Sequence, residues 1–140
     1  VFFKLIKVGS LTIKKMNSII NTKSLNLKNT LMNGQCFNWK IIDIKNIDTS
    51  NKVYVGCVSR NVIALKESHT NEIEFQFLFK NEKNLDENNF LNDYFQLDVD
   101  LDEVYNNARK TLPDDLIKII DSYDGIRIIN QEVFECIISF

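Results

Sequence analysis

The sequence offers few arrangements of side chains that could do acid, base or nucleophilic chemistry. A nucleophile needs a base beside it, and the single histidine, His69, lies in the polar run Glu67-Ser68-His69-Thr70-Asn71, which is typical of a turn. The paired acids Asp102-Glu103 and Asp114-Asp115 stand at expected helix starts, where the helix dipole already accounts for them. We therefore expect no catalytic residue within this chain.

Metal and cofactor chemistry finds equally little support. The three cysteines, Cys36, Cys57 and Cys136, are too widely spaced for a zinc site and too odd in number for a disulfide framework. We interpret them as reduced thiols of an intracellular protein. The four glycines are scattered singly, so there is no glycine-rich phosphate loop. We expect no metal and no cofactor.

One glycine has two interpretations. Asn33-Gly34 lies between two runs that alternate like strands, and this dipeptide is a strong turn signal. A glycine backbone can also approach a ligand closely. From the residues alone the turn is favoured. Phe37 and Trp39, which follow, alternate with polar neighbours, and this favours core packing over base stacking. Cys36 is interpreted as a packed thiol.

The elements that would position this loop are strands first and helices afterwards. The β-branched runs Val53 to Val58 and Val62 to Lys66 flank Ser59-Arg60-Asn61, which predicts a tight hairpin. Glu72 to Phe79 alternates with period two. Its apolar face consists of Ile73, Phe75, Phe77 and Phe79. These runs predict an antiparallel sheet with one solvated face.

After Lys80 the period becomes helical. Phe90, Leu91, Tyr94 and Phe95 are spaced as on one helix, and Asp100 with Glu103 predicts the capped start of a second. Pro113 and Gly125 bracket a third helix. Glu132 to Phe140 reads as a helix that is apolar on most sides, as expected inside a larger helical body. The fold class is therefore α+β.

The composition fits one compact domain. The chain has 140 residues, of which 44% are hydrophobic, and a formal net charge of −2. This net charge does not favour nucleic acid, but the charge is uneven. Val1 to Lys40 contains seven lysines and no acid, whereas Glu82 to Asp124 contains twelve acids and four bases. The lysine-rich part could face a phosphate backbone. No run reaches the ~20 apolar residues of a membrane span, so we expect no membrane partner.

Two blocks of sequence carry a family resemblance. The first is Asn33-Gly34-Gln35-Cys36-Phe37-Asn38-Trp39; the second joins Tyr94 to Leu101 with Gly125-Ile126-Arg127 and Glu135 to Phe140. Over Ser24 to Phe140 the chain resembles the amino-terminal part of the eukaryotic 8-oxoguanine DNA glycosylases. Two positions depart from that family: Asn38 replaces an arginine, and Val133 stands where an Asp-Pro pair commonly opens the last helix.

The resemblance implies an antiparallel sheet with helices, like one half of the TATA-binding protein, followed by the first helices of an all-α domain. It divides the chain into an N-terminal extension (1–23), the glycosylase N-terminal α+β domain (24–112) and the truncated start of the helical catalytic domain (113–140). Both ends of the chain read as cuts within a longer protein.

The resemblance also implies a function. The full-length enzyme would excise 8-oxoguanine opposite cytosine and nick the strand by β-elimination. Its partner would be double-stranded DNA containing 8-oxoguanine, and we expect a monomer in the nucleus, with the mitochondrion as the alternative. The catalytic lysine and aspartate would lie downstream, so this fragment alone should be inactive. Only Gly34 carries over as a lesion-binding residue, through its carbonyl.

Two alternatives stay open. The chain could be a non-catalytic DNA- or protein-binding module of the same fold, or part of a related glycosylase for alkylated bases. Arg127 could contact DNA, but an arginine just beyond a helix-terminal glycine can also tie this region to the sheet. We favour the structural role for Arg127.

Overall fold

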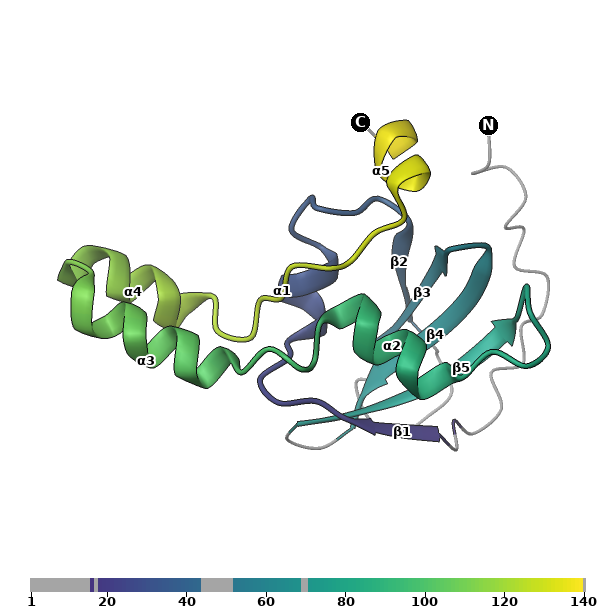
Figure 1. Ribbon diagram of the computed structural model, residues 1–140, viewed down its shortest axis with the longest axis horizontal. Helices are drawn as coiled ribbons and strands as arrows, with labels where there is room; N and C mark the ends of the chain where they lie inside the picture. The colour runs from purple at the N-terminus through teal and green to yellow at the C-terminus, as the bar shows by residue number, and fades with distance from the viewer. Residues whose placement is uncertain (1–15, 17, 44–51, 69–70, 140) are drawn as a thin grey trace.

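The computed structural model describes residues 16, 18–43, 52–68 and 71–139. Within these residues, helices and a five-stranded sheet with strand order β1-β5-β4-β3-β2 make up the fold, and every neighbouring pair of strands is antiparallel (Figure 1). The strands are β1 (Ser18–Asn21), β2 (Trp39–Asp43), β3 (Lys52–Val58), β4 (Asn61–Glu67) and β5 (Glu72–Phe79). The predicted α+β class is confirmed.

The hairpin between β3 and β4 is the tight turn that the sequence predicts. Ser59 and Arg60 have φ angles of +46° and +63°. Positive φ at both central residues is the signature of a two-residue type I′ turn, whose twist matches that of the flanking strands. The Asn61 side chain supports the turn by donating to the carbonyls of Val58 (3.2 Å) and Ser59 (3.0 Å).

The apolar face predicted for β5 is buried only over its first part. Ile73 and Phe75 are buried, Phe77 packs against the core beside Phe90, and Phe79 is exposed. Val62 and Ile63 of β4 pair with Phe79 and Phe77, so the register shifts here and Leu78 is an extra residue in β5. Such an irregularity re-aims the side chains beyond it.

Two helices pack their apolar residues with the sheet in one core cluster. They are α1 (Leu27–Leu31) and α2 (Glu87–Phe95). The α1 segment corrects the prediction, because the run before Asn33-Gly34 was expected to alternate like a strand. Asn26 caps α1 by accepting a hydrogen bond from the Asn29 N–H at 2.8 Å. Leu27 and Leu31 are both fully buried, and their spacing of four residues places them on one helical face.

The sheet also begins earlier than predicted. Strand β1 lies inside residues 1–23, which were expected to form an extension outside the domain. It pairs with β5 in the register Ser18↔Phe75 to Asn21↔Glu72, and the Thr22 N–H then donates to the Asn71 carbonyl. Because β1 supplies the edge strand beside β5, residues 18–22 belong to the sheet layer and not to an extension.

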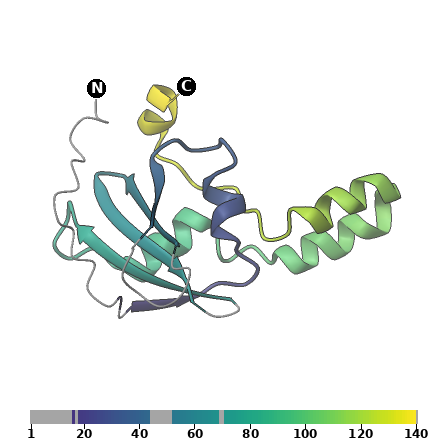
Figure 2. The same ribbon diagram turned by 180° about the vertical axis from the view of Figure 1, so that it is seen from behind.

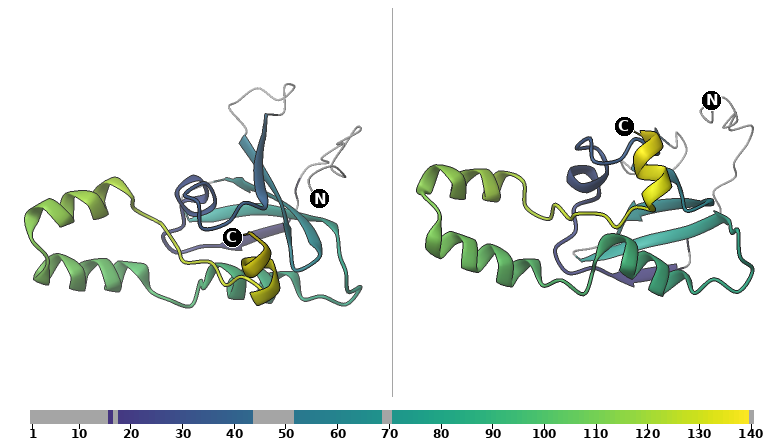
Figure 3. Two further views of the ribbon diagram at one scale, coloured as in Figure 1. Left: turned by 90° about the horizontal axis from the view of Figure 1, so that it is seen from above. Right: turned by 45° about the horizontal axis from the view of Figure 1, so that its top comes forward.

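The next two helices form a hairpin that projects from the sheet layer (Figures 1, 2 and 3). They are α3 (Leu101–Thr111) and α4 (Asp114–Ser122), and neither contains a buried residue. Asp100 caps α3 by accepting from the Glu103 N–H at 3.1 Å, which confirms the predicted capped start. The domain boundary expected at residue 113 falls between these two helices.

The last helix, α5 (Val133–Ser139), lies at the carboxyl end of the chain (Figure 1). Its large apolar side chains point outward, with exposed fractions between 66% and 71%. They are Val133, Phe134, Ile137 and Ile138. In the described part of the chain, no helix is both long and apolar enough to cross a membrane.

Candidate functional site

The loop that joins α1 to β2 contains the predicted site residue, Gly34. Its φ angle is +90°, it is exposed, and a Cβ added there would meet no atom within 4 Å. This backbone conformation is costly for any residue with a side chain. The chain bends at this residue. The bend follows helix α1, so the prediction of a hairpin turn between two strands was wrong. Glycine is needed here because of this φ angle and not for lack of space, since the space around it is open.

Gln35, directly after Gly34, is held by three hydrogen bonds of its side chain. Its Nε2 donates to the carbonyls of Thr30 and Arg127, both at 2.8 Å. Its Oε1 accepts from the Ile129 N–H at 3.2 Å. These bonds connect the loop to the end of α1 and to the segment 125–131, which lies more than ninety positions away in the sequence.

The main chain of Gln35 is also held at both ends. Its N–H donates to the Asn33 Oδ1 at 3.0 Å, and its carbonyl accepts from the Gln131 Nε2. The loop residue next to Gly34 is thus fixed on every side by groups of this chain. Sequence reasoning missed Gln35, because the amide partners that define its role come from a distant segment.

Behind the loop lies a buried cluster of Cys36, Trp39 and Tyr94. The Trp39 Nε1 donates to the Tyr94 hydroxyl at 2.9 Å, and this hydroxyl lies 4.0 Å from the Cys36 sulfur. Burial raises the pKa of the Cys36 thiol and that of the Tyr94 hydroxyl, so both stay protonated at neutral pH. Cys36 is the packed thiol that was predicted.

The two aromatic residues of the loop behave differently. Trp39 is 4% exposed, which confirms its predicted place in the core. Phe37 is 51% exposed, so the prediction of core packing was wrong for it. Strand β2 begins only at Trp39, and the alternation of buried and exposed faces that applies to a strand does not extend back to Phe37.

Arg127 has the structural role that was favoured. It is 2% exposed, and its Nη1 donates to the carbonyls of Gln96 (2.6 Å) and Val99 (3.1 Å). Its Nη2 donates to the Lys23 carbonyl. The guanidinium therefore joins three segments: the chain after β1, the connection between α2 and α3, and its own segment after α4. A residue so enclosed by protein carbonyls has no face left for DNA.

Residues 18–137 match the model of the 8-oxoguanine DNA glycosylase N-terminal domain. The chain belongs to this family. One relative is the N-glycosylase/DNA lyase of Saccharomyces cerevisiae (strain ATCC 204508 / S288c), which is 36% identical over 124 residues. That alignment covers 86% of this chain and 32% of the relative. The chain thus spans about a third of the length of the curated relative that it matches.

The family match agrees with the structure at the amino-terminal side of the sheet. It begins at residue 18, the first residue of β1, and so includes the edge strand that sequence reasoning had placed outside the glycosylase domain. It ends at residue 137, within α5. The match therefore includes the Gly34 loop, the Arg127 segment and the α3–α4 hairpin.

Among the described residues, no group of three or more histidine, cysteine or acidic side chains could hold a metal ion. Cys36, Cys57 and Cys136 are free thiols. His69 lies outside the described residues. Asp102 accepts a hydrogen bond from the Ser24 hydroxyl at 2.7 Å, so it fastens α3 to the chain after β1.

Proposed function

We propose that this chain provides the lesion-recognition loop of a longer DNA glycosylase that excises 8-oxoguanine opposite cytosine and nicks the strand by β-elimination. The proposal rests on the exposure and the backbone conformation of Gly34. This residue is exposed at φ +90°, between neighbours that are held in place, and among the described residues none donates a hydrogen bond to its carbonyl. A rigid backbone acceptor open to solvent is suited to reading a hydrogen-bond donor on a base.

The chemical difference that must be read is small. Oxidation of guanine at C8 places a hydrogen on N7, so the N7 acceptor of guanine becomes a donor in the lesion. A carbonyl aimed at N7 bonds the lesion but faces a lone pair in guanine. Leaving a buried acceptor unpaired costs about 1–3 kcal/mol, which corresponds to a preference of about tenfold or more from this one contact.

The base must leave the duplex before a carbonyl can contact it at N7 in a pocket. Glycosylases flip the target nucleotide out of the stack, which costs a few kcal/mol that contacts to the flipped base must recover. Lys28 and Lys40 flank the loop in the sequence, and both are exposed. We assign them to the approach of the phosphate backbone, which lysine binds as a point charge.

The proposal is tested by the substitution Gly34→Ala in the longer protein that contains this chain. Alanine at φ +90° is strained, so the loop should relax and turn the carbonyl away, although the added Cβ meets no atom. We expect the preference for 8-oxoguanine over guanine, both opposite cytosine, to fall about tenfold. Binding to duplexes that carry either base measures this preference.

Met32→Ala is the control for this experiment, because Met32 is an exposed residue two positions before Gly34 in the same loop. It should leave the preference unchanged. A Gly34→Ala protein that unfolds at the wild-type temperature and still prefers the lesion as strongly as wild type would contradict the proposed role of the carbonyl.

A second experiment tests where the chemistry lies. We infer from the family resemblance that the Schiff-base lysine and its aspartate lie outside these 140 residues. We therefore expect the purified 140-residue chain to release no base from a duplex with 8-oxoguanine opposite cytosine and to leave the strand intact. Release of base or nicking of the strand by this chain, seen on a denaturing gel, would place the catalytic residues within it.

A further inference from the structure

Gln35 is the residue that fixes the main chain next to Gly34. Its amide nitrogen faces two carbonyls, those of Thr30 and Arg127, and its amide oxygen faces the Ile129 N–H. A flipped amide would place its oxygen against two other oxygens and its nitrogen against a donor. The hydrogen-bond partners therefore allow one orientation of this side chain.

This side chain controls the carbonyl of Gly34 through the peptide plane. The Gly34 carbonyl and the Gln35 N–H belong to the same planar peptide unit, which is trans because no cis bond occurs among the described residues. The Gln35 N–H is held by the Asn33 Oδ1 at 3.0 Å. With the N–H and the Cα of Gln35 both held, the direction of the Gly34 carbonyl is set.

The segment that Gln35 grips is itself anchored. Arg127 supplies one of the gripped carbonyls, and its own N–H donates to the Thr30 Oγ1 at 3.2 Å while its guanidinium binds the carbonyls of Gln96 and Val99. The Gly125 carbonyl, two residues earlier, accepts from the Asn26 N–H at 2.9 Å. The segment that holds the loop is thus itself hydrogen-bonded to other parts of the fold.

We propose that Gln35 is a positioning residue for lesion recognition, which aims the Gly34 carbonyl at N7 of the flipped base without touching the base. This inference rests on the proposed function. An exposed glycine has many backbone conformations open to it, and hydrogen bonds weaken steeply when their angle falls below about 120°. Gln35 restricts Gly34 to the conformation whose carbonyl discriminates 8-oxoguanine from guanine.

The test uses Gln35→Met in the longer protein, because methionine has a similar length and makes none of the three hydrogen bonds. Binding is measured to non-cleavable 2′-fluoro duplexes with 8-oxoguanine or guanine opposite cytosine, and to one with a tetrahydrofuran abasic-site analogue. We expect binding to the lesion to weaken about tenfold. Binding to the abasic analogue should stay at the wild-type level, since it has no base for the carbonyl to contact.

Gln96→Met is the matched control. The Gln96 Nε2 donates to the Ile128 carbonyl at 2.8 Å, so this side chain binds the same segment with the same chemistry. The substitution removes only this side-chain hydrogen bond and keeps the Gln96 carbonyl that Arg127 binds. This variant should bind the lesion like wild type. If Gln35→Met does not fold, Gln131→Met serves in its place, because it removes only the hydrogen bond to the Gln35 carbonyl. It should show a smaller loss confined to the lesion duplex.

The outcomes separate the two proposals. A loss shared equally by the lesion and abasic duplexes would mean that Gln35 only supports the structure, and it would overturn the inference alone. Unchanged lesion binding by a folded Gln35→Met protein would also overturn the inference about Gln35 alone. A wild-type protein that binds lesion and guanine equally would overturn the proposed function, and the role of Gln35 would fall with it.

Discussion

At the scale of single residues, glycines in this domain serve two different purposes. Gly34 is needed for its dihedral angle, with open space around it, whereas Gly56 is needed for its missing side chain. A Cβ at Gly56 would lie 2.3 Å from the nearest atom of the Trp39 ring, so the ring occupies the space that a side chain would need. The register Trp39↔Gly56 places the two residues directly opposite each other in the sheet.

We therefore predict that Gly56→Ala lowers the free energy of unfolding by about 1–3 kcal/mol, the usual cost of overpacking. Urea unfolding followed by tryptophan fluorescence measures the change, since Trp39 is the single tryptophan of the sequence. Gly56→Ala should be much less costly in a Trp39→Leu background, where the ring is gone; far-UV circular dichroism follows unfolding there. Equal losses in both backgrounds would show that the ring is not the cause.

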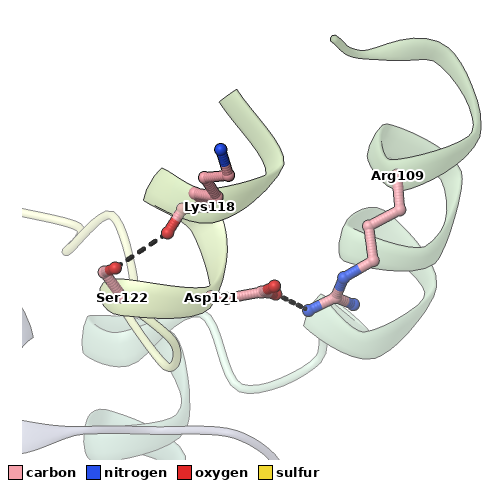
Figure 4. A network of polar contacts seen from close by, with 4 residues as sticks. All are labelled: Arg109, Lys118, Asp121 and Ser122. Carbon is pink, nitrogen blue, oxygen red and sulfur yellow. Dashed lines mark hydrogen bonds and ion pairs between the residues drawn. The ribbon is translucent and has the colours of Figure 1, made fainter. Parts of the chain in front are cut away.

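At the scale of elements, the α3–α4 hairpin differs from the rest of the molecule. Its helices are joined by an ion pair between Arg109 and Asp121, whose closest nitrogen and oxygen are 2.7 Å apart, and Ser122 donates to the Lys118 carbonyl at 2.8 Å (Figure 4). Both partners of the ion pair are well exposed, and exposed pairs contribute little, about 0–1 kcal/mol. The hairpin therefore contributes less to the stability of the domain than the sheet does.

Local sequence patterns predicted some of the elements correctly and failed for others. The capped start at Asp100 and the hairpin at Ser59-Arg60 were predictable, because each depends on groups within three residues of one another. Helix α1 was mistaken for strand, because five residues are too few to reveal a period and its Asn26 cap resembles a turn residue. Strand β1 was missed for a similar reason: with four residues, Ser18–Asn21, it is recognisable mainly by its pairing with β5.

At the scale of the whole molecule, Arg127 connects segments that are far apart in sequence. It binds the carbonyl of Lys23, which is 104 positions earlier, and those of Gln96 and Val99. Burial lowers the pKa of its guanidinium, against the opposing effect of neighbouring groups such as Tyr105 and Asp98. The charge is retained because arginine stays protonated in proteins even when it is buried.

We predict that Arg127→Met destabilises the domain by roughly 2–4 kcal/mol, because buried carbonyls that lose their donor each carry a desolvation cost. Arg109→Met is the matched control, since it removes the exposed arginine of the ion pair, and it should change stability by less than about 1 kcal/mol. Thermal unfolding by circular dichroism compares the two variants with wild type. Losses of equal size in both would contradict the role assigned to Arg127.

Two blocks of sequence indicated the family by resemblance. By itself the sequence also determined the α+β class and most of the strands and helices. These elements depend on the period of apolar residues and on caps and turns, which are interactions between neighbours along the chain. Only the tertiary structure decided that Phe37 is exposed, that β1 belongs to the sheet, and that Gln35 and Arg127 hold the loop. The farthest partner of Gln35 lies 96 positions away and that of Arg127 lies 104 positions away. No local sequence pattern predicts where such a distant group will lie in the folded chain.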